Sequence, residues 1–241
     1  MKKRLALLFA MAIIITNSPT ALAASIYSDV PEDSWAAATI EAATEYGLIN
    51  GVGGGFFGYG REISRAEFAT LVCRMFGWEL IAPETPSFPD VLPDDWYYTY
   101  VETAASNNAI YRGGNFSPKA PITRKDMSVI LVRALGYESI AEAASEYSMP
   151  FTDVIDNRGY IAVAYDIGMT SGTSATAFSP DNTAKREEAA AMLVRVLRCI
   201  RLPRDRRACG QGHTYGAQLQ RDILGRLCRD GMAQDNGAYA Y

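Results

Sequence analysis

A short motif recurs three times along this chain at a nearly fixed interval. Each copy centres on an arginine, and the arginines Arg65, Arg124 and Arg186 are separated by 59 and then 62 residues. An aromatic residue stands eight positions before each arginine, and an Asp-Val pair lies further upstream in every copy. Self-similarity at this spacing predicts a fold that is built from three copies of one supersecondary unit.

The first 23 residues have the pattern of a secretory signal peptide. Three cations precede an apolar run over residues 5–15, and the small residues Ala21 and Ala23 flank the expected cleavage point. The apolar run is too short to span a bilayer. We therefore expect export, cleavage after Ala23 and no membrane insertion of the mature chain.

Charge is distributed unevenly, with a formal net charge of −4. Residues 24–197 carry 12 cations against 23 anions, whereas residues 198–241 hold eight arginines and four acids. An acidic surface repels polyanions, which disfavours nucleic acid as a partner. Four cysteines and one histidine show no zinc-ligand spacing, so we expect neither a metal nor another cofactor.

Each motif marks the expected start of a helix. In the first two copies a hydroxyl residue is followed three positions later by an acid: Ser64 by Glu67, and Thr123 by Asp126. This is the capping-box pattern, in which each side chain satisfies a backbone N–H of the first turn. Apolar residues then recur at the spacing of a helix that is buried on one face. They are Phe68, Leu71, Val72 and Met75; Met127, Ile130, Leu131 and Ala134; and Ala189, Met192, Leu193 and Val196.

A second helical pattern precedes each motif, over about 35–46, 96–107 and 160–166. The loop between the two patterns is rich in glycine. In the first copy, residues 53–58 match the GxGxxG pattern of dinucleotide sites, but no strand precedes them, so we assign the glycines to turn geometry. Each unit is thus predicted to be helix, loop, helix, and three units must share one core because one hairpin buries too little surface.

Further motifs extend the similarity between the copies. An aromatic-x-Asp-Val segment opens each unit at Tyr27, Phe88 and Phe151, and a tryptophan follows the aspartate by six positions in the first two. Together these motifs resemble the S-layer homology family, and the resemblance covers residues 26–197. It implies a mostly all-α fold in which three helix-loop-helix repeats form a pseudo-threefold bundle with grooves between neighbouring repeats.

The resemblance also implies a domain organisation. We expect a signal peptide at 1–23, repeat 1 at 24–86, repeat 2 at 87–149, a degenerate repeat 3 at 150–197 and an Arg-rich tail at 198–241.

The ligand implied by the resemblance is a secondary cell-wall polysaccharide, which often carries pyruvate ketals with a free carboxylate. An arginine in the first turn lies beside free N–H groups and the positive end of the helix dipole, which favours carboxylate binding. We therefore expect Arg65, Arg124 and Arg186 to bind glycan carboxylates. Trp35 and Trp96 fit equally well as a glycan platform or as core residues beneath the groove.

The remaining candidate residues follow from position in the repeat. Gly51, Arg112 and Gly113 are assigned to the groove wall. Three recurring aspartates are expected to cap or brace the first helix, and three arginines nine positions after the motif are expected to be structural. The aspartates are Asp29, Asp90 and Asp153, and the later arginines are Arg74, Arg133 and Arg195.

Repeat 3 departs from the pattern. It lacks the tryptophan, and Lys185 stands where the capping hydroxyl belongs. Loss of a cap costs about 0.5 to 2 kcal/mol. On this reasoning we expect the groove that depends on Arg186 to bind weakly.

The resemblance thus implies a non-enzymatic, non-covalent cell-wall anchoring module at the bacterial cell surface, which binds an acidic, pyruvylated polysaccharide. The alternative is a structural S-layer or envelope component whose main partner is itself or another S-layer protein. Catalysis is disfavoured because no triad surrounds the single histidine and no separated carboxylate pair is evident.

Overall fold

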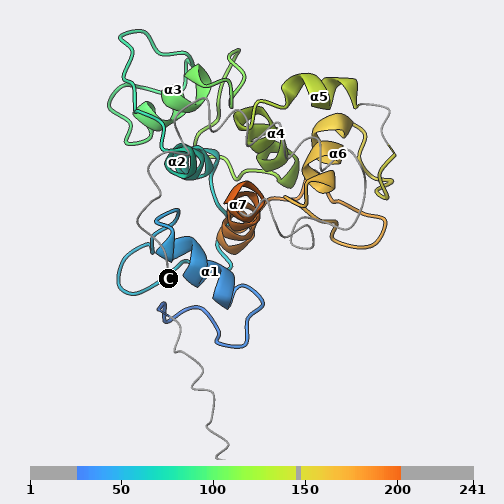
Figure 1. The fold of residues 1–241 in the computed structure, drawn as a ribbon. Helices are drawn as coiled ribbons and strands as arrows, with labels where there is room; N and C mark the ends of the chain where they lie inside the picture. Colours follow the sequence, from blue (N-terminus) through green and yellow to red (C-terminus); the bar gives the residue numbers. More distant parts are fainter. Residues whose placement is uncertain (1–25, 145–147, 202–241) are drawn as a thin grey trace, which may run out of the picture.

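The computed structural model describes residues 26–144 and 148–201. Within these ranges the chain forms seven helices and no strand, which confirms the predicted all-α class (Figure 1). The helices are α1 Ala37–Glu45, α2 Arg65–Phe76, α3 Tyr98–Ser106, α4 Arg124–Ala134, α5 Glu138–Ala143, α6 Arg158–Asp166 and α7 Arg186–Arg201. The expected signal peptide lies outside the described residues, as does the expected tail beyond residue 201.

The three motif arginines each occupy the first position of a helix, as predicted. Ser64 and Glu67 form the full capping box of α2, and Gly77 ends that helix with a left-handed φ of 62°. In α4 the Thr123 hydroxyl accepts from the N–H of Asp126 at 3.1 Å. In α7 one of the two capping-box hydrogen bonds is present, since the N–H of Lys185 donates to the Glu188 carboxylate.

Two helical features differ from the sequence prediction. The short helix α5 was not predicted, and no side-chain cap marks its start at Glu138. Helix α7 continues to Arg201, into the segment that was expected to be a tail. The helix therefore extends beyond the matching part of the repeat.

The first helix of each repeat packs on the preceding repeat. Helix α3 packs on α2, α6 packs on both α5 and α4, and α1 packs on α7, which closes the circle (Figure 1). The predicted order of helix, loop and helix is therefore correct, but the two helices of one repeat do not pack mainly on each other. Each packed pair of helices combines two repeats, so a single repeat does not contain its own partner surface.

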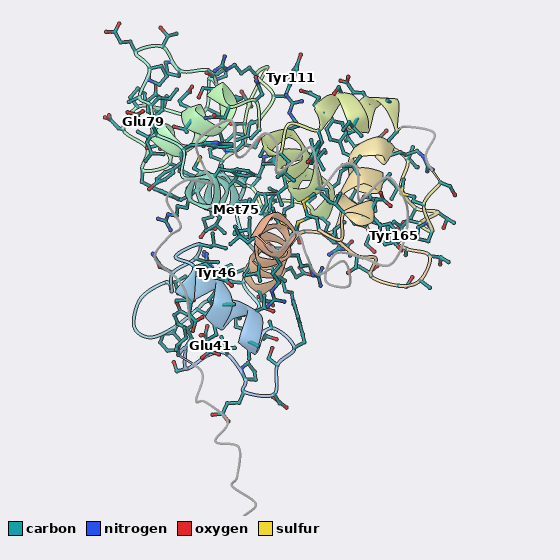
Figure 2. All side chains as sticks on the ribbon, viewed as in Figure 1. Glu41, Tyr46, Met75, Glu79, Tyr111 and Tyr165 are labelled. Carbon is teal, nitrogen blue, oxygen red and sulfur yellow. The ribbon has the colours of Figure 1, made fainter. Side chains whose placement is uncertain are left out.

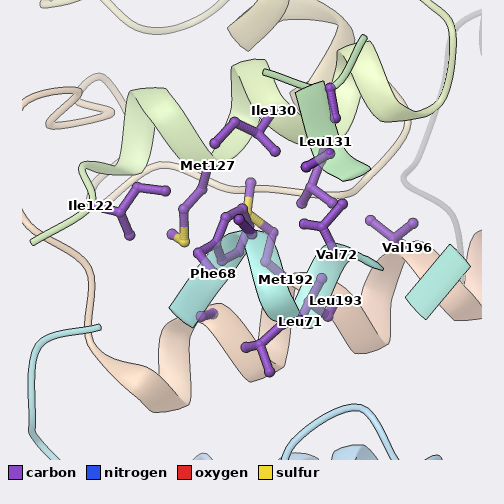
Figure 3. Packing of buried hydrophobic residues seen from close by; sticks show 14 of the residues in the cluster. Phe68, Leu71, Val72, Ile122, Met127, Ile130, Leu131, Met192, Leu193 and Val196 are labelled. Carbon is purple, nitrogen blue, oxygen red and sulfur yellow. The ribbon is translucent and has the colours of Figure 1, made fainter. Parts of the chain in front are cut away.

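Helices α2, α4 and α7 meet at the centre, where their apolar stripes face one another. Figure 3 shows side chains from all three helices converging in this core. Phe68, Met127, Leu131 and Leu193 are nearly or fully buried. The three predicted helical stripes therefore form one shared core, and burial of this apolar surface is the main force that holds the repeats together.

A closed ring of three backbone hydrogen bonds lies beside this core. The N–H of Ile63 donates to Ala184, that of Ala184 donates to Ile122, and that of Ile122 donates to Ile63, at 2.8 to 3.1 Å. All three residues are fully buried. Because a buried backbone group without a partner is costly, each repeat depends on the other two at this point.

Candidate functional site

Each motif arginine reaches forward to the loop of the next repeat. The Nε of Arg65 donates to the carbonyl of Phe116 at 2.8 Å, and Arg124 donates to Phe178 in the same way. Arg186 closes the circle by donating to Phe57 of repeat 1 at 3.0 Å. Each guanidinium also lies over the ring of the phenylalanine that it bonds, at 4.9 to 5.2 Å from the centroid. Three equivalent junctions between repeats result.

An acid from the next repeat pairs with each arginine. Arg65 pairs with Asp126, whose position in its helix corresponds to that of the capping-box glutamate in α2. Arg124 lies 3.8 Å from Glu188, and Arg186 lies 3.4 Å from Glu67. Burial tends to raise the pKa of Glu67, but hydrogen bonds from the Ser64 N–H and from Arg61 hold that pKa below its usual value.

The three guanidinium groups are buried to different extents. The side chain of Arg65 is 22% exposed, that of Arg124 is 13% exposed and that of Arg186 is 7% exposed. Arg124 and Arg186 each make a further hydrogen bond, to the carbonyls of Ser171 and Asn50 respectively. Burial lowers the pKa of Arg124 and of Arg186. Arg65 is therefore the most accessible of the three to a ligand.

The expectation that the Arg186 groove binds weakly assumed that Arg186 and the missing tryptophan of repeat 3 belong to the same groove. In the structure, however, Arg186 contacts the loop of repeat 1. Repeat 1 contains Trp35. The repeat that lacks tryptophan supplies the loop for Arg124 instead.

The recurring aspartates brace the loops and not the first helices, which corrects the sequence interpretation. The Asp29 carboxylate accepts from the N–H groups of Phe57, Gly58 and Tyr59 at 2.7 to 2.9 Å. Asp90 and Asp153 bind the corresponding phenylalanine and serine N–H groups in repeats 2 and 3. The reason is geometric: each loop turns back so that consecutive N–H groups point at one carboxylate. The aspartate thereby fixes the phenylalanine that the arginine of the preceding repeat contacts.

These bonds predict acid sensitivity. Burial tends to raise the pKa of Asp29, but hydrogen bonds from its three N–H donors hold that pKa below its usual value. Two such N–H donors lower the pKa of Asp153. A carboxylate with a lower pKa in the folded state stabilises the fold fully above its unfolded pKa, and this contribution is lost as pH falls through the folded pKa. We expect urea unfolding to give a constant stability near neutral pH and a decrease below about pH 4.

The Asp29→Asn variant should isolate this contribution. The amide of the new side chain would turn one acceptor oxygen into a donor that faces backbone N–H groups, at a cost of about 1 to 3 kcal/mol near neutral pH. The exposed Asp33→Asn variant is the matched control. Equal unfolding midpoints for the two variants at pH 7 would contradict the bracing role.

The two tryptophans are exposed, at 60% for Trp35 and 61% for Trp96, so neither is a core residue. Trp35 follows Ser34, whose hydroxyl lies 2.8 Å from that of Tyr59 in the loop that Arg186 contacts. Trp96 stands edge-on to Tyr97, with ring centroids 5.3 Å apart. Both indoles are therefore available to a ligand.

The groove-wall candidates have different roles. Gly51 is required for packing, because a Cβ there would lie 2.6 Å from the carbonyl oxygen of Phe56 and 2.7 Å from the Tyr27 ring. Gly113 has a φ of 151°, which few other residues adopt. Arg112 is exposed. The structure gives a reason for both glycines and leaves the guanidinium of Arg112 open to solvent.

The later arginines contact neighbouring elements, as expected for two of them. Arg133 donates to the carbonyl of Asn108, and its guanidinium lies 5.7 Å from the ring centroid of the exposed Tyr111 (Figure 2). Arg74 lies over the Tyr100 ring. Arg195 is exposed on α7.

Sequence reasoning missed the partners of the motif arginines. The phenylalanine carbonyls and the acids of the next repeat complete each junction, and their recurrence at the period of the motif was the available signal. Among the described residues, no three histidine, cysteine, aspartate or glutamate side chains are grouped so as to hold a metal ion. The helices in the described part of the chain are all too short or too polar to cross a membrane.

Comparison with known proteins gives the same periodicity. The S-layer homology domain model matches residues 26–69, 87–128 and 150–190, one segment in each expected repeat and slightly more than half of the chain. A surface layer protein of Brevibacillus choshinensis is 34% identical over 144 residues, which cover 57% of this chain and 13% of that relative. An S-layer protein of Bacillus thuringiensis subsp. finitimus is 27% identical over 74% of this chain and 22% of its own length.

An enzyme also matches. An amylopullulanase of Thermoanaerobacterium thermosulfurigenes is 30% identical over 71% of this chain but only 9% of its own length. The chain thus spans less than a quarter of the length of each of these relatives. The three matched segments and the three equivalent junctions place this chain in the S-layer homology family.

Proposed function

We propose that this protein is a non-covalent anchoring module that holds a cell-surface protein to the bacterial cell wall by binding an acidic, pyruvylated secondary cell-wall polysaccharide. The observation that carries the proposal is the threefold recurrence of an arginine junction between repeats. Names of relatives such as surface layer protein and S-layer protein support the location.

The Arg65 junction is the strongest candidate for the carboxylate. Its hydrogen bonds to described residues use Nε and Nη1, which leaves the Nη2 donors for a ligand. A net charge of −4 gives no long-range attraction for an anion, so local donors must supply the affinity. A guanidinium can bind a carboxylate through charge-assisted hydrogen bonds.

The three grooves are proposed to be unequal. The Arg65 groove adjoins repeat 2 with Trp96, and the Arg186 groove adjoins repeat 1 with Trp35. The Arg124 groove adjoins repeat 3, which offers no indole. We rank Arg65 first, since its guanidinium is also the most exposed, and Arg186 is limited by its burial. Binding of one polymer at two grooves would add strength through effective concentration.

Sedimentation with purified cell walls tests the proposal. The wild-type protein should sediment with walls that carry the polymer, and mild acid removal of the pyruvate ketals should abolish sedimentation. Trp96→Ala should weaken binding about three- to tenfold, because an exposed aromatic platform is lost without disturbing the core. The matched control is Ile155→Ala, which removes a side chain that is 83% exposed in repeat 3. Undiminished binding after ketal removal would overturn the carboxylate mechanism.

A second candidate function is a lattice component that acts mainly through self-association. The S-layer names of the relatives favour this candidate. It predicts concentration-dependent assembly without cell walls, and sedimentation velocity of the free protein distinguishes it from anchoring. The match to amylopullulanase covers too little of that enzyme to support a catalytic proposal.

A further inference from the structure

Repeat 2 contains a cavity whose lining does not include any of the motif arginines. It is widely open to solvent, has a volume of about 370 Å³ and lies between residues 89–97 and residues 117–120. All of its lining residues belong to repeat 2. Its size falls in the lower part of the range of small-molecule sites.

The other two repeats do not reproduce the whole of this lining, although Ser179 and Pro180 of repeat 3 stand at the positions of Ser117 and Pro118. Repeat 1 has Tyr59 where repeat 2 has Pro118, and the Tyr59 hydroxyl reaches Ser34, which stands at the position of Asp95. A tyrosine thus spans the corresponding space. In repeats 1 and 2, eleven positions separate the recurring aspartate from the matching buried residue of the first helix, Ile40 or Val101. In repeat 3 only eight positions separate Asp153 from Ile161, so the segment that corresponds to residues 89–97 is shorter. The full combination of lining residues is therefore specific to repeat 2.

The cavity offers both hydrogen-bond acceptors and a donor. Asp95 accepts from the N–H of Leu92 at 2.8 Å, and burial together with the nearby Asp95 carboxylate raises the pKa of the Tyr97 phenol. A carboxylate has about four acceptor positions, so the Asp95 carboxylate keeps positions open to a ligand. The Lys119 ammonium is an exposed donor at the rim. Asp90 is already bonded through both of its oxygens to the loop N–H groups.

Apolar and aromatic surface completes the lining. Leu92 and Pro118 contribute apolar walls, and Tyr97 contributes a buried ring. The exposed indole of Trp96 stands edge-on to that ring. Hydroxyl-binding groups beside apolar and aromatic faces suit a polyhydroxylated ring, which has polar edges and an apolar face. Two aspartates against one lysine disfavour an anion.

We propose that the cavity between residues 89–97 and 117–120 is a subsite for one uncharged sugar unit. This inference rests on the proposed function, since it assumes that a glycan is the ligand. The backbone N–H of Arg65 donates to the carbonyl of Ala120, and its Nε donates to that of Phe116, so the loop that forms one cavity wall also forms the arginine junction. A polymer that places its acidic unit at Arg65 can then place a neutral neighbour in the cavity, which gives this groove a selectivity that the other two lack.

A graft from repeat 1 tests the subsite. The double variant Asp95→Ser/Pro118→Tyr copies the Ser34–Tyr59 pair and should fill the cavity while Arg65 and Trp96 stay in place. The probes are methyl N-acetylglucosaminide and methyl glucoside, titrated against the protein with amide chemical shifts as the readout. The wild type should show saturable shifts at Ser117 and Lys119, and the graft should bind about tenfold more weakly.

A single variant and a cation control complete the test. Lys119→Ala changes only an exposed side chain, and it should weaken the same probes about threefold even if the graft does not fold. Absence of saturable shifts with either sugar, or equal affinities for wild type and Lys119→Ala, overturns the subsite. Loss of the sugar shifts when CaCl₂ is added identifies a cation site and also overturns it. Failure of the anchoring function is distinct, because it appears as failure of the wild type to sediment with cell walls.

Discussion

Replacing Arg186 by alanine should lower the free energy of unfolding by about 3 to 5 kcal/mol, the range found when one partner of a buried ion pair is removed. The Arg186 side chain is only 7% exposed. It donates to the carbonyls of Phe57 and Asn50 and pairs with Glu67. Alanine would leave the two carbonyls without this donor, while Glu67 would keep its bonds from Arg61 and the Ser64 N–H. The loop of repeat 1 would be released from α7, so the ring of repeats would open at its closing junction.

Urea denaturation at neutral pH measures this effect. Arg198→Ala is the matched control, because Arg198 is exposed on the same helix and its replacement should change stability by less than about 0.5 kcal/mol. Arg65→Ala should have an intermediate effect, since the Arg65 side chain is more exposed than that of Arg186. If Arg186→Ala unfolds at the same urea concentration as Arg198→Ala, the closing junction does not stabilise the fold.

This structural role affects how binding experiments with arginine variants are interpreted. An Arg186→Ala protein that fails to bind cell walls has lost both a candidate ligand contact and a buried structural contact. Trp96 does not carry this ambiguity, because its indole is 61% exposed. The tryptophan variants therefore report on ligand binding, and the arginine variants report first on assembly of the ring.

Local signals were sufficient to predict the motif helices. The Ser64–Glu67 capping box and the apolar stripe beginning at Phe68 act within one helix, so the sequence contains all of the information for the start and the buried face of α2. The three-copy architecture followed from the period. The short α5 was missed because it has no side-chain cap.

Partners distant in the sequence could not be predicted from one repeat. Asp29 binds N–H groups 28 to 30 positions away, and the acceptors of Arg186 lie more than 120 positions earlier. The Arg186 contacts depend on the packing of α1 against α7, whereas the Asp29 contacts lie within repeat 1 and depend on how its loop turns back. The sequence shows that the three repeats are equivalent. Which repeat each arginine contacts is determined by how the repeats pack around the core.

Replacing Gly159 by alanine should destabilise the protein by about 2 to 3 kcal/mol, although alanine is the better helix former. Gly159 lies in the first turn of α6. Helix propensity alone would favour alanine by about 1 kcal/mol in a helix interior. A Cβ at this position would, however, lie 1.7 Å from the backbone oxygen of Ala141 in α5 and 2.7 Å from its carbonyl carbon. Backbone atoms cannot rotate away, so α5 and α6 would have to separate, and overpacking of this kind typically costs about 1 to 3 kcal/mol or more.

Gly60→Ala provides a graded control for this steric effect. A Cβ at Gly60 would meet no atom within 4 Å, but its φ of +77° is unfavourable for alanine, at about 1 to 2 kcal/mol. Thermal or urea unfolding of both variants separates contact from backbone strain. We expect Gly159→Ala to lose more stability than Gly60→Ala and to disturb amide resonances in α5 as well as α6. A Gly159→Ala protein more stable than the wild type would show that helix propensity outweighs the α5–α6 contact, and that the close approach of Gly159 to Ala141 does not determine how repeat 3 packs.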